Sequence, residues 1–373
     1  MKSLPVRFFD LSRESAHNRG EFEQAIARVL ASGRYILGPE LEALEREFAG
    51  TFGVPSAVGV ASGTDALALA IEASGALKPG EGDEVITSAL TAGFTALAIY
   101  RAGAIPRFVD VDPITLQIDA SQIKSCISEK TRMLLPVHLY GHACDIQSII
   151  DLANAHKLTV IEDACQAHGA RMDGKALGTF GRAAAFSFYP TKNMGALGDA
   201  GMVLSRNPDL IQRVRQLRHG GQDRLYNHEL LGYCSRLDEI QAAVLRLKLS
   251  SLEKQNNIRR TLAARYDEAF ADLNLTLLPS NPSLVPNRHL YPIRTSRRDE
   301  LRNFLQQHGI ETLIHYPIPL PLQPAFRRFV LPGQEFPVAQ KATGELLSLP
   351  LYPELTEEEL QYTIDTVRQF FEA

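Results

Sequence analysis

The chain has 373 residues, 45% of them hydrophobic and 22% charged, and 39 Lys and Arg against 43 Asp and Glu give a net charge of −4. This composition disfavours disordered, collagen-like and coiled-coil chains, and the charge disfavours an electrostatic binder of nucleic acid. No apolar run reaches the ~18 residues that span a bilayer, and the N-terminus lacks a secretory apolar core. Four scattered cysteines without a CxxC pair are typical of reduced thiols. We therefore expect a cytoplasmic α/β protein that binds neither nucleic acid nor membrane.

The first half of the chain alternates short apolar runs with helical patterns. Two helical segments, 21–31 and 40–52, come first, and the alternation begins at residue 57. Such a pattern predicts a mostly parallel sheet covered by helices on both faces, with ligands bound beyond the carboxyl ends of the strands. The expected strands are 57–60, 84–87, 105–111, 132–140, 158–163 and 183–188, and the expected helices begin near residue 64 and cover 91–103, 119–127 and 146–156.

The second half of the chain is mainly helical before it becomes mixed. A helix at 208–218 precedes the run 239–270, which is long enough for one helix, or two joined helices, linking two domains. A proline-rich stretch at 277–287 then separates this run from a small α+β tail. We expect a large α/β domain over residues 1–250, and a linking helix with a smaller α+β domain over 251–373. The tail elements are expected at 289–295 (strand), 299–309 and 357–373 (helices).

A glycine-containing turn, Ser62-Gly63-Thr64-Asp65, lies between the first expected strand and its helix. Free backbone N–H groups at a helix start suit a phosphate group. An ordinary helix cap by Ser62 or Thr64 explains the same residues equally simply.

Two adjacent carboxylates, Glu162 and Asp163, close the very apolar strand at 158–163. Burying them is costly unless hydrogen bonds or a cation meet them. One interpretation is that Asp163 faces a buried cation beyond the sheet, with Gln166 near the same site. The other interpretation is that one of the two carboxylates caps a following helix.

Lys192 lies five positions after an apolar strand, in a turn rich in Pro, Thr, Asn and Gly. Most lysines are solvated, but a lysine at this place can be desolvated and serve as a nucleophilic amine. A phosphate turn, a strand-end aspartate and a lysine, in this order, together suggest a site for pyridoxal 5'-phosphate.

The chain resembles the pyridoxal-phosphate-dependent sugar aminotransferases of the DegT/DnrJ/EryC/StrS type, which have fold type I. The resemblance covers nearly the whole length and is carried by YILGPELEALEREFA, ASGTDALALA, PVHLYGHACDI, IEDACQAHGA, FSFYPTKNMGALGDAGMV, GYCSRLDEIQAA and LSLPLYPELTEEEL. It implies that Lys192 forms the internal aldimine and shuttles a proton, and that Asp163 keeps the pyridine nitrogen protonated. It further implies that Gln166 contacts the ring hydroxyl and that the phosphate is held by Gly63, Thr64 and Ser187.

Two positions depart from the family pattern. The family motif GYNxR places an asparagine that reaches the neighbouring subunit's cofactor phosphate, and here that position is Cys234, a poor substitute for an amide donor. Ser235 or Tyr233 are alternative donors for this contact. Ala92 stands where the family has an aromatic residue that stacks on the pyridine ring. Phe94 is the nearest aromatic residue, and it is either the stacking residue or part of a helix core.

The segment 309–326 resembles the subgroup that aminates C-3 of dTDP-linked 3-oxo-6-deoxyhexoses. The resemblance implies an amino-acid donor, glutamate on family grounds, and a nucleotide-linked keto sugar as acceptor. His315 and Tyr316 offer neutral groups for a sugar or nucleotide, or else belong to the domain junction, and Tyr35 is a further candidate at the substrate mouth.

The polar stretch 222–233 corresponds to an arm that crosses to the other subunit in the family, so the resemblance implies a homodimer with shared active sites. Tyr226, His228 and Arg236 are candidates for that partner site, although Arg236 more simply forms a structural ion pair.

Other functions remain possible on the sequence. They are a C-4 sugar aminotransferase, a dehydratase of the same fold (disfavoured because its lysine is replaced by His) and a non-catalytic regulatory or binding protein of the same fold. Glycines at 195–201 do not open a dinucleotide-binding unit, which argues against an oxidoreductase. A metal site is disfavoured too; the residues weighed as ligands are His138, His142, Cys144, Cys165 and His168.

Overall fold

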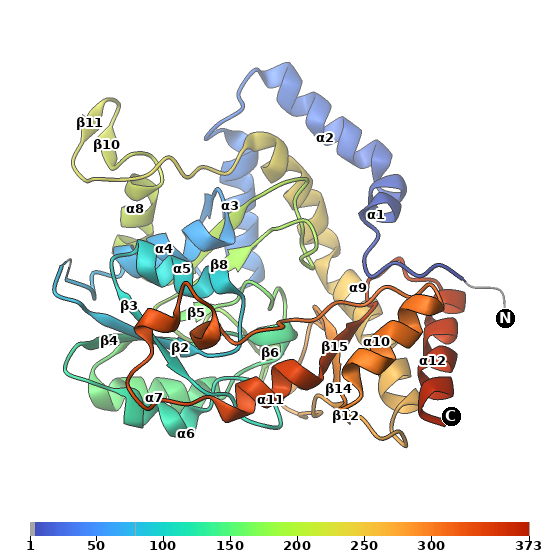
Figure 1. Ribbon diagram of the computed structural model, residues 1–373. Coiled ribbons are helices and arrows are strands. Elements are labelled where there is room, and N and C mark those ends of the chain that lie inside the picture. The colour runs from blue at the N-terminus through green and yellow to red at the C-terminus, as the bar shows by residue number, and fades with distance from the viewer. Residues whose placement is uncertain (1–3, 79, 373) are drawn as a thin grey trace.

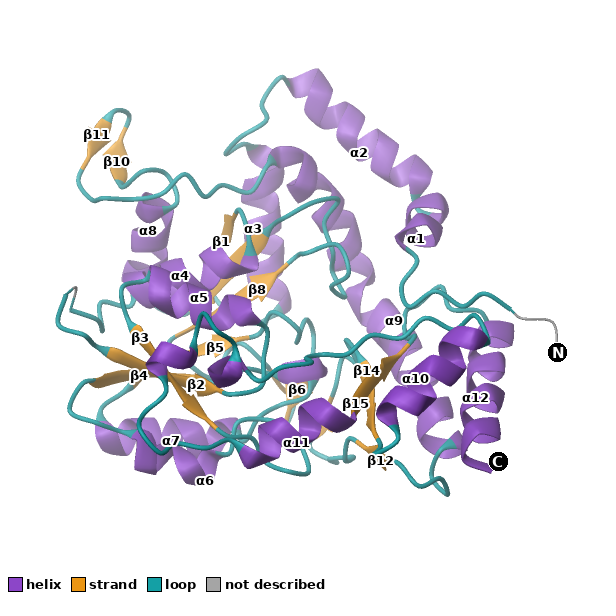
Figure 2. Cartoon of the chain, in the orientation of Figure 1, coloured by secondary structure: helices purple, strands orange, loops and turns teal. Residues whose placement is uncertain are grey.

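The computed structural model describes residues 4–78 and 80–372. Its centre is a seven-stranded sheet in the order β1-β9-β8-β5-β4-β2-β3 (Figures 1 and 2). The strands from β8 to β3 run parallel, whereas β9 is antiparallel to both of its neighbours. The expected fold class, a mostly parallel sheet between helices, is therefore confirmed. The strands are β1 (Ser56–Val60), β2 (Glu84–Ser88), β3 (Ile105–Val109), β4 (Thr131–Leu135), β5 (Thr159–Asp163), β8 (Ala183–Ser187) and β9 (Gly201–Ser205).

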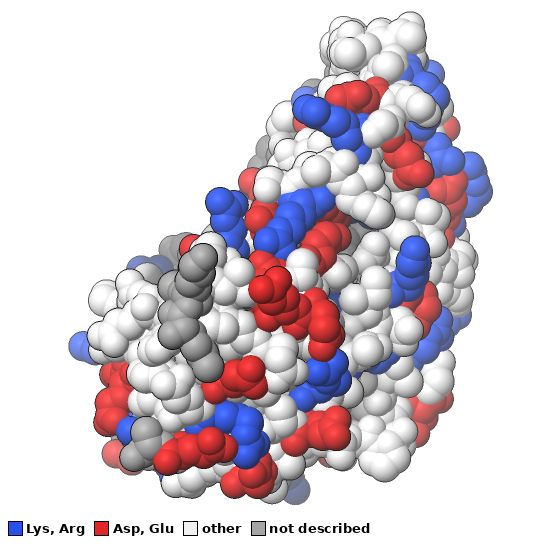
Figure 3. Space-filling view, turned by 90° about the vertical axis from the view of Figure 1, so that its right-hand side faces the viewer, with Lys and Arg blue, Asp and Glu red and all other residues white. Residues whose placement is uncertain are grey.

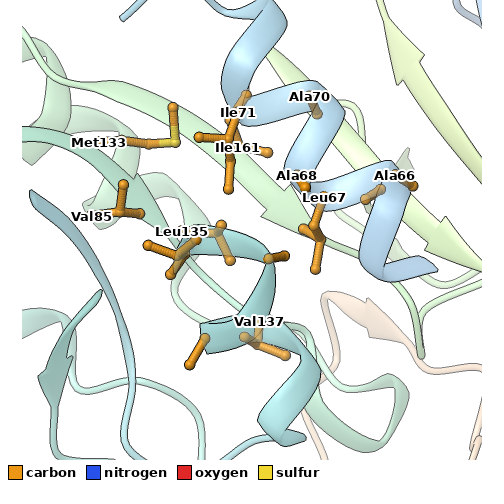
Figure 4. Close-up of a cluster of buried hydrophobic side chains, with 14 of the residues drawn as sticks. Ala66, Leu67, Ala68, Ala70, Ile71, Val85, Met133, Leu135, Val137 and Ile161 are labelled. Atoms are coloured by element: carbon orange, nitrogen blue, oxygen red, sulfur yellow. The ribbon is translucent and has the colours of Figure 1, made fainter. Parts of the chain in front are cut away.

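Helices cover both faces of this sheet because alternate strand residues point to opposite sides. On one face α4 and α5 pack on side chains such as Val85, Leu135 and Ile161 (Figure 4). The other face is covered by α7 over the β2 to β5 half and by α3 and α9 over the β8 to β1 half. These helices are α3 (Pro39–Thr51), α4 (Gly63–Ala73), α5 (Gly93–Arg101), α6 (Ala120–Ile123), α7 (Ile146–His156), α8 (Pro208–Leu217) and α9 (Glu239–Ala269).

The run expected as one or two helices is the single 31-residue helix α9. Leu245 and Leu252 in its first half belong to the core beneath the large sheet, while Leu262 and Tyr266 belong to a separate C-terminal core. The expected boundary at 250/251 falls within this helix and stays a prediction. The C-terminal elements are α10 (Arg298–Gln307), α11 (Pro337–Glu345), α12 (Glu357–Glu372) and the sheet of β12 (Thr276–Leu277), β14 (Tyr291–Arg294) and β15 (Leu346–Leu349).

The remaining elements lie at the edges of the molecule. The hairpin of β10 and β11 projects from the body (Figure 1), and α2 packs against α9. Val6 forms an isolated parallel β-bridge with Ile310, so the N-terminal segment packs on the C-terminal part of the chain. These elements are α1 (Leu11–His17), α2 (Arg19–Ser32), β6 (Arg171–Met172), β7 (Lys175–Ala176), β10 (Gln222–Arg224), β11 (Asn227–His228) and β13 (Leu284–Val285).

Some expected elements are shorter than their patterns. The strand expected over 132–140 ends at Leu135, since Pro136 has no N–H for the ladder and Tyr140 takes a left-handed backbone conformation with φ 62°. The helix expected over 119–127 is one short α-helical turn followed by a 3₁₀ turn. Two helices, α1 and α11, are not predicted by the pattern. Nor are the strands β6, β7, β9, β10, β11, β12, β13 and β15.

The surface around the chain termini carries both signs of charge, with acidic and basic side chains interspersed (Figure 3). In the parts of the chain that the structure describes, no helix combines the length and apolar character needed to cross a membrane.

Candidate active site

A cavity of about 1410 Å³ opens beyond the carboxyl ends of the parallel strands. Asp163 and Ser187, the last residues of β5 and β8, both line it. This is where open α/β sheets bind their ligands. Its wall is completed by the start of α4, the start of α5, the loop after β8, the N-terminal Phe8 and Phe9, and the segment 309–316.

Lys192 lies in the tight loop after β8, where its backbone N–H donates to the carbonyl of Tyr189 at 2.8 Å. Its side chain reaches the cavity, and its Nζ lies 3.3 Å from Nε2 of His289. Burial lowers the pKa of Lys192 below its usual value of 10.5, although Cys165 and Asp163 oppose the shift. A buried amine of lowered pKa can act as a nucleophile and as a base.

Asp163 is only 4% exposed, and its carboxylate faces the same cavity. Oδ2 accepts from Thr95 Oγ1 at 2.8 Å, and Oδ1 accepts from the backbone N–H of Cys165 at 3.1 Å. Within residues 4–78 and 80–372 no cationic side chain forms an ion pair with it. A buried carboxylate without an ion-pair partner suits a cationic ligand such as a protonated pyridine ring.

The neighbouring Glu162 has a different environment. Its carboxylate is fully buried and accepts from Nε2 of His138 at 2.9 Å and from the backbone N–H groups of Gly178, Phe180 and Gly181 at 2.7–2.8 Å. It therefore holds the loop after β7 and does not line the cavity. Neither carboxylate caps a following helix, so that alternative is wrong.

The start of α4 forms the other end of the cavity. Ser62 is the N-cap and accepts from the backbone N–H of Asp65 at 3.1 Å, which leaves the N–H groups of Gly63 and Thr64 directed to the helix start. The cap interpretation is therefore confirmed, and the phosphate site at the same turn stays a prediction. A Cβ on Gly63 would come within 2.5 Å of the Ser187 Cβ, so only glycine fits there.

Gln166 links the cavity to the C-terminal part of the chain. Its Oε1 accepts from the backbone N–H of Tyr140 at 2.7 Å, and its Nε2 donates to the hydroxyl of Tyr316 at 3.2 Å. His315 also lines the cavity, and its Nδ1 lies 3.0 Å from Ser348 Oγ. Burial lowers the pKa of His315 to about 4, with a further contribution from Lys192, so its ring is neutral at pH 7. The pair is thus both at the domain junction and in the cavity.

Phe94 lines the cavity and is 64% exposed, so it is not part of a helix core. It is the second residue of α5, and Ala92 is the N-cap of that helix. Tyr35 is not brought into the cavity: its side chain is 48% exposed, and its carbonyl accepts from the backbone N–H of Glu239 at 3.0 Å. Its role at a substrate mouth remains a prediction from the sequence.

The region around Cys234 is engaged within its own subunit. Ser235 Oγ donates to Asp65 at 2.7 Å and Tyr233 OH donates to Glu72 at 2.9 Å, so both alternative donors are already occupied. Cys234 is exposed and accepts from Nη2 of Arg236 at 3.0 Å. No ion pair of Arg236 is found among the described side chains, so the structural ion pair expected for it is not observed.

The histidines and cysteines weighed as metal ligands are dispersed. His138 pairs with Glu162 and lies 3.6 Å from Cys144 Sγ, whereas His142 faces Arg288 at 3.4 Å. His168 packs between Phe186 and Phe188. In the described part of the chain no group of three or more His, Cys, Asp or Glu side chains is placed to hold a metal ion.

Two residues of the cavity have no local sequence signal. Thr95 bonds to Asp163 from the first turn of α5, and His289 reaches Lys192 from a loop 97 residues further along the chain. The sequence pattern around His289 predicts only the start of a strand. Only the tertiary fold brings these groups together.

The chain matches the model of the DegT/DnrJ/EryC1/StrS aminotransferase family over residues 17–368. It is 42% identical to a "Pleiotropic regulatory protein" of Geobacillus stearothermophilus, with 99% of each chain covered. It is 45% identical to the dTDP-3-amino-3,4,6-trideoxy-alpha-D-glucose transaminase of Streptomyces venezuelae, with 98% of this chain and 96% of the relative covered.

Solved structures agree with this assignment. The fold matches S. venezuelae DesV in complex with a ketimine intermediate, with a TM-score of 0.96, 45% identity and 99% and 100% of the two chains covered. It also matches NtdA from Bacillus subtilis with bound cofactor PMP, with a TM-score of 0.92, 30% identity and 100% and 86% coverage. The chain therefore belongs to the DegT/DnrJ/EryC1/StrS aminotransferase family and is a pyridoxal-phosphate-dependent transaminase.

Proposed function

We propose that this transaminase moves an amino group from an amino-acid donor, glutamate, to C-3 of a nucleotide-linked 3-oxo-6-deoxyhexose carried on dTDP. The observation that supports it most is one cavity that holds the Lys192 amine, the Asp163 carboxylate and the start of α4. The cavity volume of about 1410 Å³ exceeds the roughly 300–1,000 Å³ typical of a pocket for one small ligand. It therefore leaves room for a cofactor and a nucleotide sugar together, as the name of the S. venezuelae relative suggests.

When bound, pyridoxal 5'-phosphate supplies an electron sink and carries the amino group between the two substrates. Lys192 is the residue that attaches the cofactor and then moves the proton at the reacting carbon. Its lowered pKa favours the neutral amine that such a base requires. Asp163 holds the proton on the pyridine nitrogen, since an ionised carboxylate offsets the cost of burying a cation.

The remaining cofactor contacts follow from the cavity wall. Gly63 and Thr64 bind the phosphate with the free N–H groups of the first turn of α4, and the Ser187 hydroxyl lies beside them. Gln166 holds the ring hydroxyl with the side-chain amide that already contacts Tyr316. Phe94, exposed at the cavity wall, stacks on the ring in place of an aromatic residue at position 92.

The sugar end lies toward the C-terminal part of the chain. His315 and Tyr316 both line the cavity, and the pKa of Tyr316 is raised by burial. Both side chains are therefore neutral hydrogen-bonding groups at pH 7, which suits recognition of sugar hydroxyls.

The working form is a cytoplasmic homodimer with shared active sites. The arm 222–233, which contains the hairpin of β10 and β11, exposes large apolar side chains, among them Leu225 at 74% and Leu231 at 96%, and a partner surface would bury them. Tyr226, His228 and Arg236 belong to this arm or its base, and they reach the partner's cavity.

A regulatory role without turnover is the second candidate, because the G. stearothermophilus relative is named as a regulatory protein. The departures at Ala92 and Cys234 are in its favour, and the intact set of Lys192, Asp163 and the α4 start is against it.

The test is an amination assay of the purified protein with glutamate and a panel of dTDP-3-oxo and dTDP-4-oxo sugars. The proposal predicts a clear preference for the 3-oxo set. Preference for the 4-oxo set would move the reaction to C-4, and no amination of any sugar by a cofactor-loaded protein would favour the regulatory role.

A further inference from the structure

A row of side-chain amides lies behind Lys192, and its hydrogen bonds have a fixed direction. Asn256 is fully buried, and its Nδ2 donates to the carbonyl of His168 at 2.8 Å. Because a carbonyl only accepts, the Oδ1 of Asn256 must be the group that faces Asn193, and it accepts from Asn193 Nδ2 at 2.8 Å. The same Nδ2 donates to the carbonyl of Asn287 at 2.8 Å, which fixes the amide of Asn193 as well.

The orientation of Asn193 determines the tautomer of His289. Both N–H groups of Asn193 Nδ2 are used in these two bonds, so the group that faces His289 is the amide oxygen Oδ1. This oxygen can only accept, and it lies 3.1 Å from Nδ1 of His289. Nδ1 must therefore carry the proton. A neutral imidazole has a single N–H, so Nε2 presents a lone pair to Nζ of Lys192 at 3.3 Å.

His289 stays neutral in this position. It is only 4% exposed, and burial lowers its pKa well below 6.5, with further lowering by Lys192, Arg259 and His315. A ring of such low basicity does not take a proton from Lys192. What it offers is a hydrogen-bond acceptor of fixed direction.

We propose that His289 is a positioning residue for Lys192, whose amine donates a hydrogen bond to His289 Nε2 whenever that amine is not bonded to the cofactor. The bond holds the flexible lysine side chain in one place at the cavity wall, where it can bond to the cofactor again or move a proton. The inference rests on the proposed role of Lys192. It adds that the amide row from Asn256 to Asn193 serves this orientation.

The test compares two variants of similar size. His289→Leu keeps the bulk but removes the acceptor, whereas His289→Gln keeps an amide oxygen near the position of Nε2. The first readout is the rate at which apo protein takes up pyridoxal 5'-phosphate, followed by the visible absorbance that appears. We expect this rate, and kcat, to fall about 10- to 100-fold in His289→Leu while the KM for the sugar changes little. His289→Gln should stay within about threefold of the wild type, as should the exposed-surface control His156→Ala.

The outcomes separate this inference from the proposed function. Uptake and kcat at the wild-type level in His289→Leu would overturn the inference alone, and so would equal losses in the Leu and Gln variants, since these would indicate a structural role. A wild-type protein that takes up no pyridoxal phosphate would overturn the proposed role of Lys192 first. If His289→Leu does not fold, His289→Ala replaces it against the same Gln variant.

Discussion

The adjacent carboxylates Glu162 and Asp163 offer a sharp test, because the structure gives them separate tasks. In Glu162→Gln one carboxylate oxygen becomes an NH₂ group. Whichever way the amide turns, two of the four present donors then face another donor in a fully buried place. Each unmet buried group costs about 1–3 kcal/mol, and breaking a buried ion pair about 3–5 kcal/mol. We expect the free energy of unfolding to fall by about 3–5 kcal/mol.

In Asp163→Asn the two hydrogen bonds, from Thr95 and from Cys165, meet an amide whose oxygen can still accept one of them. We expect a stability change of about 1 kcal/mol and a loss of transamination of roughly 10²–10³-fold, the scale of a lost electrostatic contact to reacting groups.

The assay pairs guanidinium unfolding of each apo protein with the transamination rate of the loaded enzyme. Glu300→Gln is the matched control, since its ion pair with Arg297 at 2.9 Å is exposed and contributes about 1 kcal/mol or less. A loss below 1 kcal/mol in Glu162→Gln, or equal unfolding of both variants, would refute the assignment of separate tasks.

Three further outcomes follow from the same structure. In Gly63→Ala the new Cβ would lie 2.5 Å from that of Ser187, so we expect overpacking to cost about 1–3 kcal/mol and to weaken cofactor affinity in a spectral titration; unchanged affinity would contradict the phosphate site. Burial alone would lower the pKa of His138, but Cys144 and the buried carboxylate beside it raise it from 6.5 to about 10. The stabilisation that protonated His138 gives the fold is therefore complete below pH 6.5 and is lost as the pH rises toward 10. The free energies of unfolding of the wild type and of His138→Gln should converge across this pH range. The proposed homodimer predicts that replacing the exposed Leu231 by Glu shifts the protein toward monomer in size-exclusion chromatography, and an unchanged elution volume would argue against the arm as the dimer contact.

Much of the fold is readable from the sequence because buried parallel strands are continuous apolar runs of fixed length. The same logic places Asp163 and Lys192 near the carboxyl end of the sheet, since Asp163 ends one such run and Lys192 lies in the loop after another. The antiparallel strand β9 is not predicted. It lies between β8 and β1, and its partner β1 is more than a hundred residues away in the chain, so its place in the sheet depends on a long-range contact.

The rest of the site depends on tertiary contacts. His289, Phe8 and Thr95 reach the cavity from three different parts of the chain, and no local pattern marks them. Pattern also cannot assign one role to each of two adjacent carboxylates. The two carboxylates have different roles because consecutive strand residues point in opposite directions, which places Glu162 and Asp163 on opposite faces of β5.

The central claim is that Lys192 is the attachment point of pyridoxal 5'-phosphate in a transaminase. Its most direct test is reduction of the loaded protein with borohydride, followed by peptide mass mapping. The account predicts that the cofactor is trapped on the peptide containing Lys192 and that Lys192→Ala is colourless and inactive. A cofactor adduct on another lysine, or transamination retained by Lys192→Ala, would contradict it.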